Sequence, residues 1–98
     1  MEQKKIKMIN NASVFKISKL FRLQWEPAQN AHVLLYPEGM VKLNDSAGEI
    51  LSRVDGKKSL NQIVDDIEST FKQDGIREDV ISFIEIALNN GWIKSEES

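Results

Sequence analysis

The chain offers few side chains that could perform chemistry. His32 is its single histidine, and it contains no cysteine. A zinc ion commonly needs three or four protein ligands, and without cysteine there can be no thiolate nucleophile and no cysteine-bound cluster. A lone histidine on an expected strand, with no nucleophile elbow in the sequence, does not make a Ser–His–Asp triad either. We therefore interpret His32 as a structural or surface residue.

The acidic pairs Asp65-Asp66 and Glu78-Asp79 are the next candidates for a reactive site. Neighbours in sequence point about 100° apart on a helix, so the two carboxylates of each pair do not converge. We interpret both pairs as solvated helix surface. The sequence also lacks the glycine-rich motifs that bind dinucleotides or nucleoside triphosphates. The residues thus favour a binding protein over an enzyme, and they predict neither a cofactor nor a metal.

The length and the charge distribution of the chain exclude further classes of protein. The chain has 98 residues, 41% hydrophobic and 29% charged, which is room for one domain with one core. Residues 1–20 carry five lysines and one glutamate, whereas the remainder carries a net charge of −6. A basic arm on an acidic body is not typical of a nucleic-acid binder. Since no apolar run approaches a membrane span or a signal peptide, we expect a soluble, cytoplasmic protein.

The front half of the chain predicts strands. Residues 21–25 alternate apolar and polar side chains, which is the period of a half-buried strand. Turn residues at 26–30 separate them from 31–36, which is rich in β-branched and large apolar side chains. Pro37-Glu38-Gly39 suits a tight turn before a return strand at 40–43. These segments predict a three-stranded antiparallel meander.

The back half predicts three helices. They are expected at 45–55, at 59–72, and from near Arg77 to a stop at Asn89-Asn90-Gly91. Asn44, Asp45 or Ser46 can cap the first helix, and Ser46 with Glu49, like Ser59 with Gln62, matches the capping box that begins a helix. The short connection at 55–58 suggests a helix–turn–helix with the sheet as its wing. We therefore predict an α+β fold, winged helix-turn-helix-like, in which a three-stranded antiparallel sheet is followed by three helices.

The third helix has more apolar surface than one packing face can bury. Its apolar residues are Val80, Ile81, Phe83, Ile84, Ile86, Ala87 and Leu88. On a helical wheel Val80, Ile84 and Ala87 cluster toward the core, whereas Ile86 lies roughly 140° away from that direction. A widened apolar arc beside an exposed strand edge indicates a groove for a partner segment or a dimer contact.

Two stretches resemble the PqqD family, the pyrroloquinoline quinone (PQQ) biosynthesis protein D. Residues 22–44 include RLQWEPAQ and VLLYPEGMVKLN, and residues 46–56 begin SAGEIL and end in Asp-Gly. The closing Gly91-Trp92-Ile93 matches as well. The resemblance covers about residues 18–94. We expect residues 1–17 to form a basic, partly disordered arm and residues 95–98 a short tail.

The resemblance implies a non-catalytic protein. The family resembles the winged-helix peptide-recognition element of pathways for ribosomally made and post-translationally modified peptides (RiPPs). Such a protein would act as a peptide chaperone, binding the precursor peptide PqqA and presenting it to PqqE, a radical S-adenosylmethionine enzyme. A radical enzyme needs cysteine-ligated clusters, and since this chain contains no cysteine, the chemistry would lie in the partner.

The resemblance also implies where the peptide binds, namely as a strand added to the sheet edge beside the third helix. The corresponding positions here are Met40, Val41, Lys42, Leu43 and Asn44 on the strand and Ile81, Phe83, Ile84, Ala87 and Leu88 on the helix. Val41, Leu43, Ile84 and Ala87 equally fit a core role, and both interpretations stay open. Proline at Val41 or Leu43 is expected to remove an edge hydrogen bond and weaken peptide binding.

Two other functions compete with peptide binding. A DNA-binding winged helix would need basic residues on the third helix, yet that helix carries Arg77 against Glu78, Asp79 and Glu85. Only the basic arm favours this alternative. A homodimer is the other alternative, because an exposed edge strand can pair with a second copy or exchange a segment with it.

Overall fold

The computed structural model describes residues 9–96, which form six strands and three helices. In chain order these are β1 (Val14–Ile17), β2 (Arg22–Glu26), β3 (Ala31–Tyr36), β4 (Gly39–Lys42), α1 (Asp45–Leu51), β5 (Asp55–Ser59), α2 (Leu60–Phe71), α3 (Arg77–Asn89) and β6 (Ile93–Ser95). The predicted α+β class, with a three-stranded meander and three helices, is confirmed. A second sheet, which the sequence did not predict, is added to it.

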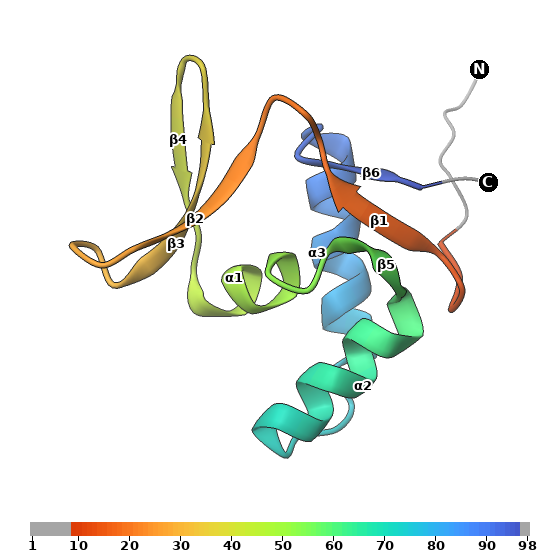
Figure 1. Cartoon of the computed structure of the whole chain (residues 1–98). Coiled ribbons are helices and arrows are strands. Elements are labelled where there is room, and N and C mark those ends of the chain that lie inside the picture. The colour runs from red at the N-terminus through yellow and green to blue at the C-terminus, as the bar shows by residue number, and fades with distance from the viewer. Residues whose placement is uncertain (1–8, 97–98) are drawn as a thin grey trace.

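The strands form two separate antiparallel sheets, in the orders β2-β3-β4 and β5-β1-β6. Figure 1 draws the first sheet on the left, with its two hairpin turns projecting away from the helices, and the second on the right. Helix α3 is drawn between them and α2 below. The protein is therefore a helical centre with one projecting sheet and one sheet that joins the two ends of the described chain.

The β2-β3-β4 sheet follows the predicted meander closely. Leu23, Leu34 and Val41 lie opposite one another across the three strands. Leu34 is fully buried, and its two neighbours pack against the core. Because side chains alternate between the faces of a strand, this row defines the inner face of the sheet. A tight turn joins β3 to β4 where the sequence predicted one, but it contains Pro37 and Glu38 only, because Gly39 pairs with Tyr36 as the first residue of β4.

The β5-β1-β6 sheet was not expected. Phe15 on the central strand is 1% exposed, and Ile93 on β6 is 2% exposed, so both belong to the core. The predicted basic arm, residues 1–17, therefore ends in a strand, while its residues 1–8 lie outside the described part of the chain. Residues 55–58, interpreted as a helix–helix turn, belong to β5. Strand propensity depends on partners in space, and the five residues of β5, DGKKS, carry little local strand signal.

Local capping sets the helix starts. Ser59 and Gln62 form the predicted capping box of α2, with N–H to side-chain oxygen distances of 2.9 and 3.2 Å. Helix α1 is capped by Asn44, one of the three predicted candidates, whose Oδ1 accepts the Ala47 N–H at 2.7 Å. The predicted Ser46–Glu49 capping box is wrong, because Ser46 lies inside the helix. The helix ends at Leu51, before the predicted residue 55, because Asp55 pairs with β1.

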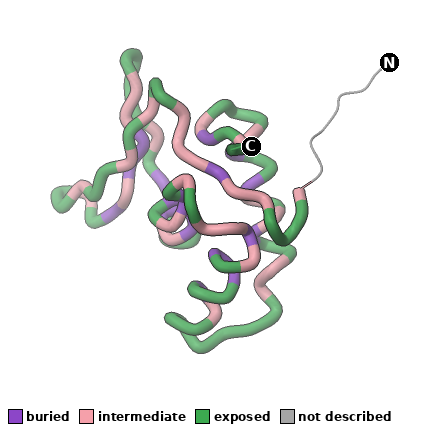
Figure 2. Tube along the Cα trace, turned by 45° about the vertical axis from the view of Figure 1, so that its right-hand side comes forward, coloured by how far each residue is buried: buried purple, intermediate pink, exposed green. Residues whose placement is uncertain are grey.

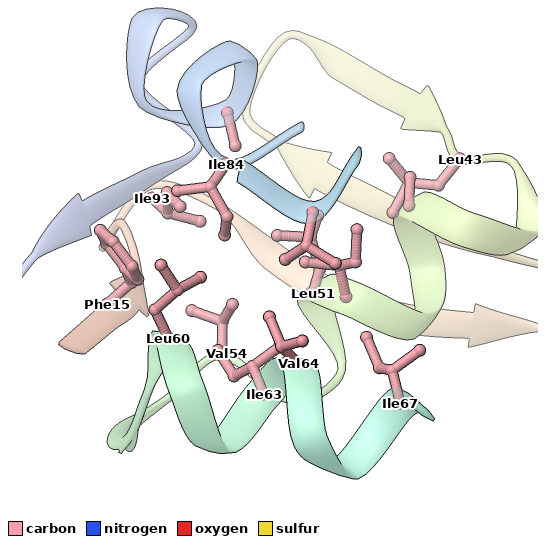
Figure 3. Packing of buried hydrophobic residues seen from close by; sticks show 14 of the residues in the cluster. Phe15, Leu43, Leu51, Val54, Leu60, Ile63, Val64, Ile67, Ile84 and Ile93 are labelled. Atoms are coloured by element: carbon pink, nitrogen blue, oxygen red, sulfur yellow. The ribbon is translucent and has the colours of Figure 1, made fainter. Parts of the chain in front are cut away.

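The core lies where β1, β3, β6 and all three helices meet. Figure 2 shows the buried segments facing this centre, whereas the hairpin turns are exposed. Figure 3 shows side chains from α1, α2 and α3 converging with Phe15 and Ile93 of the second sheet. The core cluster comprises Phe15, Leu34, Leu43, Ala47, Ile50, Leu51, Val54, Leu60, Ile63, Val64, Ile67, Val80, Ile84, Ala87 and Ile93. The core thus brings residues near both ends of the described chain, Phe15 and Ile93, into contact with residues from its middle.

Arg53 holds α1 against α2. Its Nε donates to Asp66 at 2.6 Å and its guanidinium donates to Glu49 at 2.9 Å, while its side chain is only 14% exposed. Burial acts to lower the pKa of Arg53, but the hydrogen bonds to both carboxylates outweigh it and raise that pKa. This ion pair sets the position of α1 relative to α2.

Candidate functional site

The outer edge of β4 is the first part of the candidate site. Within residues 9–96, β4 pairs only with β3. The Leu43 N–H donates to the His32 carbonyl at 3.0 Å. The backbone N–H and C=O groups of Leu43 and Val41 therefore face β3. Backbone groups of an antiparallel strand alternate between its two sides, so Met40 and Lys42 direct theirs to the open edge. The expectation that proline at Val41 or Leu43 removes an outward hydrogen bond is therefore wrong.

The strand-side candidates divide by burial. Met40 is 46% exposed, and Lys42 and Asn44 are also exposed. Val41 is half-buried against the core and Leu43 is 4% exposed. Among these five residues, Met40, Lys42 and Asn44 have surface that a partner can contact, while Leu43 has the core role that the sequence left open.

The helix-side candidates divide in the same way. Ile84 and Ala87 are completely buried, so in this structure they belong to the core. Ile81, Phe83 and Leu88 are half-buried and pack against that core. Phe83 has a further role because it lines a hollow between helices, and its ring lies 6.3 Å from that of Trp92, between centroids. Most of the predicted α3 residues therefore pack in or against the core, and Phe83 lies at the accessible edge of this helix face.

A groove of about 600 Å³ is the second part of the candidate site. It lies between the start of α1, the end of α2 and the first three turns of α3. Asn44 lies at its boundary with β4 and Phe83 lies on its α3 wall. Two of the predicted residues therefore meet in this groove, at the end of the β4 edge.

Three groove residues with accessible apolar surface were not among the predicted site residues. Phe71 and Ile86 are 45% and 52% exposed, and Ile76 is half-buried. The signal for Ile86 was present in its outward position on the helical wheel. Phe71 follows Ile67 at the spacing of the buried stripe of α2, but it lies in the last turn of the helix and is exposed.

His32 has a structural environment. Its ring lies 5.1 Å from that of Trp25 in an edge-to-face arrangement, and its other side abuts Gly48 of α1. A Cβ at Gly48 would lie 2.6 Å from His32 Nδ1, so only glycine allows this approach. Within residues 9–96 no three His, Asp or Glu side chains are grouped to hold a metal. In the same residues, no helix has both the length and the apolar character to cross a membrane.

A family model described as Coenzyme PQQ synthesis protein D (PqqD) matches residues 31–93. The chain belongs to the PqqD family. The predicted resemblance is thereby confirmed. Relatives named PqqA binding protein include one from Azotobacter vinelandii, 60% identical over 75 residues, which are 76% of this chain and 82% of that protein. One from Stutzerimonas stutzeri is 52% identical over the same shares of both chains.

Solved structures give the same fold. The solution structure of the PqqD part of Methylobacterium extorquens PqqCD, described as a functional and stand-alone RiPP recognition element, superposes with a TM-score of 0.74. It is 26% identical, and the match covers 89% of this PqqD-family chain and 95% of that one. The heterocyclase TruD matches with a TM-score of 0.65 at 20% identity, over 85% of this chain and 11% of TruD, which shows the fold alone.

Proposed function

We propose that this PqqD-family chain is a non-catalytic, cytoplasmic peptide chaperone of PQQ biosynthesis. It binds the precursor peptide PqqA as a strand added to β4 and presents it to the radical S-adenosylmethionine enzyme PqqE. The observation that carries the proposal is the open β4 edge, which ends at an apolar groove. The relatives named PqqA binding protein and the match to a RiPP recognition element support the same ligand class.

The geometry of β4 suits an extended peptide. Outward backbone groups of Met40 and Lys42 offer two donor–acceptor sets on one edge, spaced about 7 Å apart by the rise of a strand. Their hydrogen bonds hold any sequence in register, whereas pockets for alternate side chains provide selectivity. The exposed Met40 side chain and the groove beyond Asn44 are such contacts. Ordering a disordered peptide costs about 2–5 kcal/mol, so micromolar affinity is expected.

Presentation to PqqE requires that the peptide and the enzyme contact different surfaces. An added strand on β4 covers one edge of the sheet, while the β2 edge and the outer sides of the helices stay accessible. The peptide therefore remains open to an enzyme along its own outer edge.

The test replaces Lys42 with proline and, as a matched control, with alanine. Lys42→Pro removes an outward N–H and places a ring at the edge, whereas Lys42→Ala removes the side chain and keeps the N–H. We expect Lys42→Pro to weaken binding of synthetic PqqA about tenfold, which corresponds to about 1.4 kcal/mol and the loss of one hydrogen bond with its unpaired partner. Isothermal titration calorimetry measures both affinities.

Equal thermal unfolding midpoints of Lys42→Pro and Lys42→Ala show that both variants are folded, so that a difference in affinity reports on binding. Equal PqqA affinity of Lys42→Pro and Lys42→Ala would contradict strand addition at β4. Lack of PqqA binding by the unaltered protein, alone and with PqqE present, would contradict the proposed function itself. Co-elution of the chain, PqqA and PqqE from a sizing column tests presentation.

A further inference from the structure

The groove has an apolar base and two large apolar side chains that are still exposed. Ile50 and Val80 are 5% and 2% exposed and belong to the core. Above them Phe71 of α2 and Ile86 of α3 are 45% and 52% exposed. Large apolar side chains gathered in one hollow indicate a contact surface, because singly scattered ones are the ordinary case on a protein surface.

All the charged side chains that line the groove are acidic. The charged residues that line the groove are Asp45, Glu49 and Asp79. Glu49 is paired with Arg53 at 2.9 Å, whereas no basic side chain among residues 9–96 lies within 4.0 Å of the carboxylates of Asp45 or Asp79. Their positions in the first turns of α1 and α3 favour a carboxylate locally. The helix ends alone do not explain why both flank an exposed apolar surface.

The groove continues the β4 edge. Asn44 follows the last outward-facing residue of β4, Lys42, by two positions and lies on the groove wall. At about 3.3 Å per residue, a peptide strand paired with Lys42 reaches the groove within two or three residues. An extended strand that pairs with β4 is therefore long enough to reach the groove with its next residues.

We infer that the groove binds a segment of the precursor peptide that carries an apolar side chain flanked by lysine or arginine. This inference rests on the proposed function and adds the chemical class of the segment bound. The apolar side chain covers Phe71 and Ile86, and the flanking cation lies near the carboxylates of Asp45 and Asp79. An acidic flank would be repelled by the same carboxylates, so the groove also selects the register in which the peptide pairs with β4.

The experiment compares two neighbouring acids of α3. Asp79 lines the groove, whereas Glu78 precedes it in the same helical turn and does not. Asp79→Asn and Glu78→Gln each remove one negative charge from the helix start, so their effects on helix stability are matched. Synthetic PqqA is titrated into each variant at 50 and 300 mM NaCl by isothermal titration calorimetry.

We expect Asp79→Asn to weaken PqqA binding about threefold at 50 mM NaCl and the double variant Asp45→Asn/Asp79→Asn about tenfold. The difference should shrink at 300 mM NaCl, where salt screens exposed charges. Glu78→Gln should leave affinity unchanged. A PqqA peptide whose lysine and arginine residues are replaced by glutamine should lose affinity for the unaltered protein but not for the double variant.

Each result supports or overturns the inference. Equal affinities of Asp79→Asn and Glu78→Gln, or undiminished binding of the glutamine-substituted peptide, would overturn it while leaving strand addition at β4 intact. A protein that does not bind PqqA at all would remove both the inference and the proposed function. The Lys42 variants test backbone pairing at β4, and the Asp79 variant tests the charge of the groove. Failure of the proposed function and failure of this inference are therefore distinguishable.

Discussion

The two sheets differ in what their edges offer. The edge strands β5 and β6 of the second sheet carry Lys57, Lys58 and Lys94 within only five and three residues. Lysine on an edge strand opposes pairing with another strand, and β5 carries two lysines in succession. The β4 edge instead carries an exposed Met40 and one lysine, and it ends at the apolar groove. One sheet therefore closes the fold, and the other stays open to a ligand.

This difference separates folding from binding in a chain of 98 residues. The β5-β1-β6 sheet joins residues near both ends of the described chain, with Val14 opposite Ser59 and Phe15 opposite Ser95. The β2-β3-β4 sheet pairs only sequence neighbours through short turns. Long-range pairing makes the β5-β1-β6 sheet dependent on the whole fold, while the β2-β3-β4 sheet can present an edge without losing its register.

The largest expected effect tests the structural role of β1. Phe15→Ala removes a side chain that is 1% exposed, and it should lower the free energy of unfolding by about 3–5 kcal/mol. Leu20→Ala, at a position 70% exposed, is the control and should change it by less than about 0.5 kcal/mol. Urea denaturation measures both. Equal small effects would show that β1 is not part of the cooperative fold.

An intermediate effect tests how α1 supports the open sheet. Gly48→Ala places a Cβ 2.6 Å from His32 Nδ1 and should destabilise the protein by about 1–3 kcal/mol. In a His32→Ala background the same change should cost less, because the ring is absent and only the Cβ of residue 32 remains, 3.2 Å from the added Cβ. A double-mutant cycle of thermal and urea unfolding gives the coupling. Equal costs in the two backgrounds would refute the close contact.

The smallest effect concerns β5 and pH. The Asp55 carboxylate accepts the backbone N–H groups of Lys58 and Lys57 at 2.8 and 2.9 Å, which lowers its pKa from 3.8 to about 2. The unfolded chain binds this proton more readily, so the stabilisation is present above pH 3.8 and is lost as the pH falls toward 2. The stability difference between the unaltered protein and Asp55→Asn should therefore shrink from pH 5 to pH 2 in thermal melts. A constant difference would contradict it.

Local signals predicted the elements that depend on neighbours in sequence. The Ser59–Gln62 capping box, the Pro37-Glu38 turn and the strand at 31–36 all occur as expected. For the candidate site, the apolar excess of α3 predicted an exposed Ile86, and the edge position of β4 predicted its open side. The helical wheel also placed Val80, Ile84 and Ala87 toward the core, and all three are buried, whereas the resemblance assigned Ile84 and Ala87 to peptide contact. The groove itself was not predictable, because α1, α2 and α3 form its walls only once they pack together.

The sequence by itself determined the α+β class, the meander, the capped start of α2 and the PqqD family, because periodicity, capping and turn chemistry act over a few residues. Only the tertiary structure decided that residues 14–17 and 55–59 are strands, that α1 stops at Leu51, and that the groove meets the β4 edge. These features join segments far apart in sequence. Their free energy comes from pairing and burial that exist only once the core has formed.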